Sequence, residues 1–178
     1  MRKIYLLVLL LTLCITARAQ TNSVHTNALM WATGTINVGV DLRVHNNVSI
    51  DLFAFGNPIK TPKVSLQAVG FQPAVRYWFY ETGVGPFTSV HGSVAAYDIG
   101  NKHHHYKGML YGVGVSYGYN WILSKRWSVG VELGVSALFI KNTRRGYTTH
   151  YTEDEYIHHN RSWTVAPSKA DVSFIYLF

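Results

Sequence analysis

The sequence predicts an all-β protein, an eight-stranded antiparallel transmembrane up-and-down β-barrel. Apolar and polar residues alternate in segment after segment, the connections between segments are alternately short and long, and the 178-residue chain ends on an aromatic residue, Phe178. Successive side chains of a strand point to opposite faces of the sheet. A strand with one apolar face and a length near 9 to 11 residues is typical of membrane barrels.

The clearest strand covers residues 110–121. From 111 onward its odd positions carry Tyr, Val or Trp, and its even positions carry Gly, Ser or Asn. Its length exceeds that of most strands in soluble proteins. The small even face leaves room for bulky inward neighbours such as Arg76 and Trp78. The strand therefore predicts a packed interior.

The same alternation predicts seven further strands. They cover residues 27–31, 36–44, 48–55, 70–80, 87–97, 127–139 and 170–178. Pro73 interrupts one of them and cannot donate to a ladder, so we expect a bulge or a missing hydrogen bond there. Three longer connections, 56–67, 98–108 and 141–167, are polar and lack a sustained period, which favours loops. All three fall at one end, as the extracellular loops of outer-membrane barrels do.

The first 19 residues resemble a removable secretory signal. Arg2 and Lys3 precede an apolar run, and Ala17-Arg18-Ala19 offers a small-residue cleavage site. We therefore expect a signal peptide at 1–19, a barrel domain at 20–178 and an outer-membrane location. The only cysteine lies in the signal, so the mature chain has no disulfide. A soluble β-sandwich remains the alternative fold.

Net charge and aromatic placement agree with a membrane barrel. The formal charge of +7 falls to +4 without the three basic residues of the signal, because 13 basic then face 9 acidic residues. This mild excess suits anionic lipid head groups and does not indicate nucleic acid. Aromatic rings gather near the predicted periplasmic strand ends, as in interfacial girdles: Tyr77, Phe79, Tyr119, Trp121, Trp127, Tyr176 and Phe178.

Charged residues at inward positions predict a filled lumen. The candidates for interior ion pairs are Asp41, Arg43, Asp51, Arg76, Glu132 and Asp171. An eight-stranded barrel is filled by its own side chains, and buried ions persist when they are paired. We expect Arg76 and Glu132 to form the central pair. The alternative is a pore lined by these charges.

A barrel enzyme that modifies lipopolysaccharide or lipid, by acyl transfer or ester hydrolysis, is the rival function. Ser89, His91 and Ser93 share a face and Glu132 could lie inside, but an interior triad would be shielded from lipid, and no G-x-S-x-G element is present. Histidines 103–105, 150, 158 and 159 lack the spacing of a zinc site. We therefore predict a non-enzymatic protein with no cofactor, metal or catalytic residue.

The longest predicted loop, 141–167, mixes arginine with aromatic residues, a combination common at binding surfaces. Its interaction candidates are Arg144, Arg145, Tyr151 and Trp163. We expect a structural or surface-interaction role through the extracellular loops. The expected partners are outer-membrane lipid, lipopolysaccharide and a surface complex protein.

Segments 72–78, 110–119, 121–127 and 175–178 resemble an uncharacterised domain-of-unknown-function family of small outer-membrane β-barrel proteins of Bacteroidota. The resemblance covers the chain from Thr26 onward. It implies a small outer-membrane barrel without an established activity, so it transfers no catalytic residue, and it suggests a fimbrial partner. Phe178 resembles the C-terminal aromatic signal read by outer-membrane assembly machinery.

Overall fold

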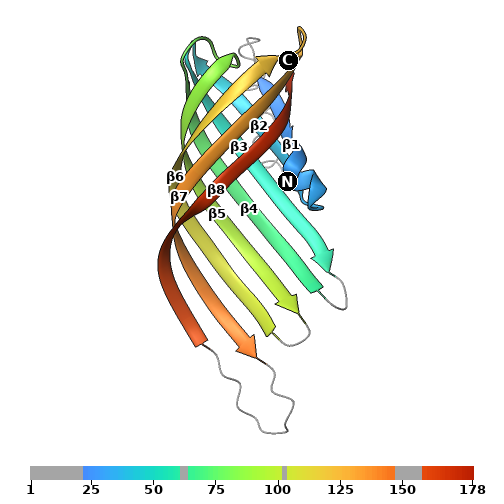
Figure 1. Ribbon diagram of the computed structural model, residues 1–178, viewed down its shortest axis with the longest axis vertical. Coiled ribbons are helices and arrows are strands. Elements are labelled where there is room, and N and C mark those ends of the chain that lie inside the picture. The colour runs from blue at the N-terminus through green and yellow to red at the C-terminus, as the bar shows by residue number, and fades with distance from the viewer. Residues whose placement is uncertain (1–21, 61–63, 102–103, 147–157) are drawn as a thin grey trace, which may run out of the picture.

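The computed structural model describes residues 22–60, 64–101, 104–146 and 158–178 and shows a closed eight-stranded β-barrel. Each strand pairs antiparallel with its neighbour in sequence, and β8 closes the barrel against β1 (Figure 1). The strands are β1 (Ser23–Asn27), β2 (Ile36–His45), β3 (Val48–Lys60), β4 (Val64–Trp78), β5 (Gly85–Asn101), β6 (His104–Ile122), β7 (Trp127–Gly146) and β8 (His158–Leu177). The predicted fold class, an all-β antiparallel barrel of eight strands, is confirmed.

Burial alternates along the strands with polar residues inside and apolar residues outside. In β6, Val113 is 65% exposed whereas Ser116 is 5% exposed. In the part of the chain that the structure describes, more polar and charged residues than hydrophobic ones are buried. Among the described residues, no helix is long and apolar enough to cross a membrane.

The predicted first strand at 27–31 is wrong. Strand β1 ends at Asn27, and helix α2 (Ala28–Ala32) follows it. The Asn27 side chain accepts hydrogen bonds from the backbone N–H groups of Leu29, at 2.8 Å, and Met30, at 3.3 Å. These bonds cap the first turn of the helix, so a local capping signal overrides the weak alternation of this segment.

The three long connections are mostly strand, which corrects the predicted loops at 56–67, 98–108 and 141–167. Strand β7 continues to Gly146 and β8 begins at His158, with Lys141 paired to Arg161. The β5–β6 ladder likewise pairs Asp98 with Lys107. Backbone hydrogen bonds sustain these extensions, whose sequences mix polar and apolar residues without a sustained period of two.

Three irregularities interrupt the described ladders. In the β2–β3 ladder the register shifts between Arg43 and His45, so Val44 is the extra residue there. The β4–β5 pairing passes from Phe71–Val94 to Ala74–His91 without a register shift and skips Pro73, so the missing bond occurs rather than the bulge. A true bulge lies between β7 and β8, where Gly134 pairs with Lys169 and Val135 with Pro167. Ser168 is therefore the extra residue of β8.

Candidate functional site: a buried charge cluster

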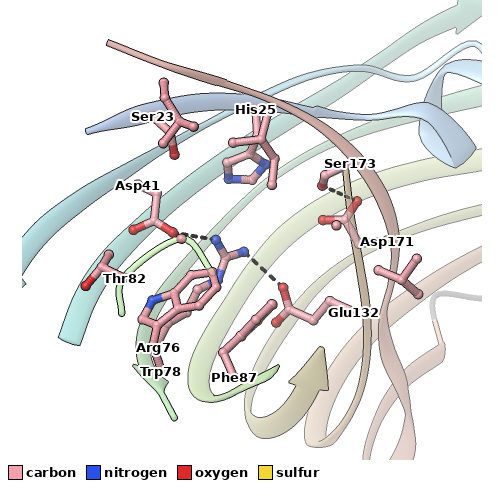
Figure 2. Close-up of a pocket in the computed structure, with 15 residues that line it drawn as sticks. Ser23, His25, Asp41, Arg76, Trp78, Thr82, Phe87, Glu132, Asp171 and Ser173 are labelled. Atoms are coloured by element: carbon pink, nitrogen blue, oxygen red, sulfur yellow. Dashed lines mark hydrogen bonds and ion pairs between the residues drawn. The ribbon is translucent and has the colours of Figure 1, made fainter. Parts of the chain in front are cut away.

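Arg76, on β4, is the centre of an ion-pair cluster inside the barrel. Its guanidinium lies 2.7 Å from Asp41 Oδ2, 2.9 Å from Asp51 Oδ2 and 2.9 Å from Glu132 Oε2. Figure 2 shows Arg76 between Asp41 and Glu132. These carboxylates come from β2, β3 and β7. The expected Arg76–Glu132 pair is present, and Arg76 also joins two further acidic candidates.

The cluster contains two basic residues that the sequence analysis missed. Lys169 Nζ lies 2.9 Å from Glu132 Oε1 and 3.6 Å from Asp51 Oδ2. His25 Nε2 lies 2.7 Å from Asp51 Oδ1. Lys169 adjoins the bulge and His25 precedes the predicted first strand, so both fell outside the predicted strands. Extending the alternation by one step before Asp171 would have found Lys169.

Hydroxyl groups complete the hydrogen bonding of Glu132. Ser116 Oγ donates to Glu132 Oε1 at 2.5 Å, and Ser89 Oγ donates to the same oxygen at 3.2 Å. The carboxylate thus has a partner from β4, β5, β6 and β8. A carboxylate can remain ionised inside a protein when it has such ion-pair and hydrogen-bond partners.

Glycines of β6 make room for this packing, although not directly for Arg76 and Trp78 as expected. A Cβ at Gly118 would collide with the Phe87 ring, and one at Gly112 would collide with Leu138. Phe87 in turn packs on Trp78, with ring centroids 4.5 Å apart, and lies 5.1 Å below the Arg76 guanidinium. The glycines therefore act through intervening apolar side chains.

The other two ion-pair candidates occupy different positions. Asp171 is buried and accepts a hydrogen bond from Ser173 Oγ at 2.7 Å. Arg43 lies near the β2–β3 turn, where its guanidinium donates to Asn46 Oδ1 at 3.1 Å. The structure therefore places Arg43 at the barrel end and the acidic candidates inside it.

A cavity of about 20 Å³ lies between the charge cluster and the β4–β5 turn. Its lining includes Asp41, Glu132, Asp171 and Thr82, which surround one space in Figure 2. The volume suits one or two water molecules. Asp41 Oδ1 has no hydrogen-bond partner among the described residues, which gives such a water a polar contact.

The β4–β5 turn closes the end of the barrel nearest this cavity. The Thr82 hydroxyl donates to the carbonyl oxygens of His45, at 3.0 Å, and Asn46, at 2.9 Å. Asn120 Nδ2 donates to the Gly83 carbonyl. These bonds hold the turn across the barrel mouth. The charge cluster and the β4–β5 turn together fill the lumen at the short-turn end. Among the described residues, no group of histidine, cysteine or acidic side chains could hold a metal ion.

A neutral polar layer lies on the other side of the cluster. His91 Nε2 is 2.9 Å from Ser168 Oγ and 3.0 Å from Ser136 Oγ. The enzyme hypothesis grouped His91 with Ser89, Ser93 and Glu132. In the structure these two serines have other partners: the Ser89 hydroxyl donates to Glu132, and the Ser93 hydroxyl accepts a hydrogen bond from Gln72. His91 Nδ1 has no partner among the described residues, so no acid orients the imidazole.

The surface candidates are only partly described. Trp163 is 74% exposed, with its ring centroid 5.2 Å from that of Phe139. Arg144 and Arg145 lie in β7, where only their backbone is described. Tyr151, His103, His150 and the predicted signal lie outside the described residues. Phe178 is exposed, and its N–H donates to the Asn22 carbonyl at 3.0 Å.

Fold and site define a closed eight-stranded β-barrel whose lumen is filled by a buried ion-pair cluster. The chain belongs to the family described as "Protein of unknown function (DUF3575)", whose model matches residues 5–178. It has no match among the curated proteins.

Proposed function

We propose that the protein is an integral outer-membrane β-barrel with a filled lumen and a structural or surface-interaction role. The main observation behind this proposal is that the barrel has charged residues inside and apolar residues outside, the reverse of a soluble protein. Asp51, Arg76 and Glu132 are buried, whereas Val75, Val115 and Leu133 point outward and are more than half exposed. Soluble monomers rarely expose apolar patches larger than a few hundred Å². A lipid bilayer is the solvent that suits this exterior.

Aromatic side chains support this placement because they lie at two levels along the barrel, one near the short turns and one at Phe139, as expected at the two membrane–water interfaces. Near the short turns, the rings of Tyr119 and Trp121 lie 4.6 Å apart, and those of Trp127 and Tyr176 lie 5.1 Å apart. Phe139 follows Trp127 by 12 residues along β7. A strand tilted by about 40° rises roughly 2.5 Å per residue, so these 12 residues span about 30 Å. That length matches the hydrocarbon core of a bilayer.

The filled lumen favours interaction over transport. The Arg76 cluster crosses the barrel and the Thr82 turn covers one end, so we infer that small solutes do not pass. We assign the interaction to the opposite end, which carries Arg144, Arg145 and Trp163. The further candidate, Tyr151, lies outside the described residues. The partners we propose are outer-membrane lipid, lipopolysaccharide and a surface or fimbrial complex protein, in keeping with the Bacteroidota family that the sequence resembles.

A pull-down of the full chain from native outer membranes in mild detergent tests this role. We expect a specific protein to co-purify with the wild type and to be lost from an Arg144→Ser, Arg145→Ser, Trp163→Ala variant. The matched control, Lys125→Ser with Arg126→Ser, changes two charges at the opposite, short-turn end and should retain the partner. Recovery from the soluble periplasm, or equal binding by both variants, would contradict the proposal.

The rival function, a lipid-modifying enzyme, has one observation in its favour: His91 contacts two serine hydroxyls. Mass spectrometry of lipid A from a deletion strain separates the two functions. The interaction role predicts an unchanged acylation pattern. A pattern restored by the wild type but not by His91→Gln would establish the enzyme instead.

A further inference from the structure

The outer faces of β7 and β8 change from apolar to basic toward the end of the barrel opposite the short turns. Three successive pairs join the two strands on this face: Ala137 with Val165, Phe139 with Trp163, and Lys141 with Arg161. The pairs are aliphatic, aromatic and cationic in that order. All six side chains belong to the outward-facing series of their strands, and only Phe139 is partly buried. A lipid beside these strands would meet all three kinds of surface in turn.

Strand β6 extends the aromatic pair of this surface. Strands β6, β7 and β8 lie side by side (Figure 1), with Tyr111 paired to Phe139 and Met109 paired to Lys141. The Tyr111 hydroxyl donates to Met109 Sδ at 3.4 Å, so the ring is directed toward the level of Lys141. The rings of Phe139 and Trp163 lie 5.2 Å apart. Three neighbouring strands thus present an aromatic row next to the basic pair.

The positive charges of Lys141 and Arg161 are not neutralised within the described part of the chain. Both side chains are exposed, and no described carboxylate lies within ion-pair distance of either. Like charges directly opposite each other on neighbouring strands are destabilising. Lys107 on β6 differs, because Asp98 lies opposite it on β5. An anion bound between Lys141 and Arg161 would relieve their repulsion.

The level of the basic pair follows from the membrane placement proposed above, on which this inference rests. Phe139 lies at the outer boundary of the hydrocarbon core, and Lys141 is two residues further along β7. At roughly 2.5 Å per residue, Lys141 lies about 5 Å beyond that boundary. The head groups occupy roughly 5 to 7 Å on each side of the core. Lys141 and Arg161 therefore lie among the head groups, whereas Val165, which is 77% exposed, faces the acyl chains.

We propose that this patch binds lipopolysaccharide of the outer leaflet, with a phosphate of its lipid A held between Lys141 and Arg161. A phosphate monoester carries about 1.5 to 2 negative charges at neutral pH and accepts the paired N–H groups of a guanidinium. Trp163 and Phe139 contact the acyl chains where these leave the head group, and Val165 contacts them deeper in the bilayer. A zwitterionic phospholipid fits less well, because its own cation neutralises its phosphate.

Binding of fluorescently labelled lipopolysaccharide to the folded full chain in dodecyl maltoside, followed by anisotropy, tests this inference. Lys141→Ser with Arg161→Ser should weaken binding by about tenfold or more, because charge-assisted hydrogen bonds to phosphate are lost. Lys125→Ser with Arg126→Ser is the matched control. It removes one lysine and one arginine at the short-turn end and should bind as the wild type does. Equal affinity of the two double variants would overturn the site.

The choice of lipid is tested by changing the ligand. Lipopolysaccharide treated with phosphatase should bind the wild type about as weakly as the untreated lipid binds the Lys141→Ser, Arg161→Ser variant. An excess of phosphatidylglycerol or of inorganic phosphate should displace little of the labelled lipid. Undiminished binding after phosphatase treatment, or full displacement by either competitor, would overturn the assignment to lipopolysaccharide.

Insertion into phosphatidylcholine vesicles separates this site from the membrane barrel itself. The Lys141→Ser, Arg161→Ser variant should insert and show the same heat-modifiable mobility as the wild type, because both side chains lie outside the barrel. A wild type that inserts but does not bind lipopolysaccharide overturns the site and leaves the membrane barrel standing. A wild type that fails to insert overturns the membrane placement on which the site rests.

Discussion

Replacing Arg76 by methionine is the sharpest perturbation of the filled barrel. The substitution preserves much of the apolar stem and removes a cation that lies within 2.9 Å of three carboxylates. Lys169 would remain, 2.9 Å from Glu132 but 3.6 Å from Asp51. Asp41 would lose the guanidinium that lies 2.7 Å from its Oδ2. The variant therefore leaves buried negative charge without compensation.

The expected loss of folding stability is large. Breaking a buried ion pair by removing one partner costs about 3 to 5 kcal/mol. The upper part of that range applies, because Arg76 is 5% exposed and its three acidic partners are also buried. Removing one carboxylate at the same time relieves part of the uncompensated charge. Arg76→Met with Glu132→Gln should therefore be less destabilised than the sum of the two single variants.

Urea unfolding in detergent micelles, followed by tryptophan fluorescence and by heat-modifiable mobility, measures these differences. Arg43→Met is the matched control, because Arg43 lies at the barrel end, where its guanidinium donates to the exposed Asn46 side chain. We expect the control to change stability by less than about 1 kcal/mol. Equal stability of Arg76→Met and Arg43→Met, or strict additivity in the double variant, would refute the reasoning.

Three further outcomes follow. In planar bilayers the wild type should show no steady conductance and Arg76→Ala should raise it; a steadily conducting wild type would rule out the filled lumen. Gly114→Ala should destabilise the barrel by about 1 to 3 kcal/mol, since its Cβ meets Ser136 Oγ and the Val135 carbonyl, whereas Gly56→Ala, with open space, should be tolerated in the same urea titration. Asn27→Ala should cost about 1 kcal/mol by loss of the α2 cap, and an unchanged midpoint would contradict that role.

The sequence predicted the strands that have two different environments. In β6 one face carries exposed apolar residues, and the other carries buried residues that are small or polar. The alternation from Tyr111 to Trp121 therefore predicted this strand. The same contrast identified Asp41, Asp51, Arg76 and Glu132 as inward residues. The pairing of Arg76 with Glu132 was predictable because inward charges in a narrow barrel must find partners.

Where both faces of a strand meet similar surroundings, the prediction failed. The outer part of β8 exposes both Thr164 and Val165, so no period marked it as strand. Lys169 keeps the alternation of Asp171 and was missed because the predicted strand began at Ala170, beside the bulge at Ser168. Helix α2 depended on a single side-chain cap at Asn27, which the alternation did not reveal.

The central claim, a membrane-embedded barrel with an apolar exterior and a filled interior, is tested most directly by gel mobility of the protein extracted from outer membranes. The account predicts that the full chain sediments with the outer-membrane fraction. Unboiled in dodecyl sulfate, it should run as a compact band, and boiling should shift that band. A protein that fractionates with the soluble periplasm and shows a single mobility before and after boiling would contradict the claim.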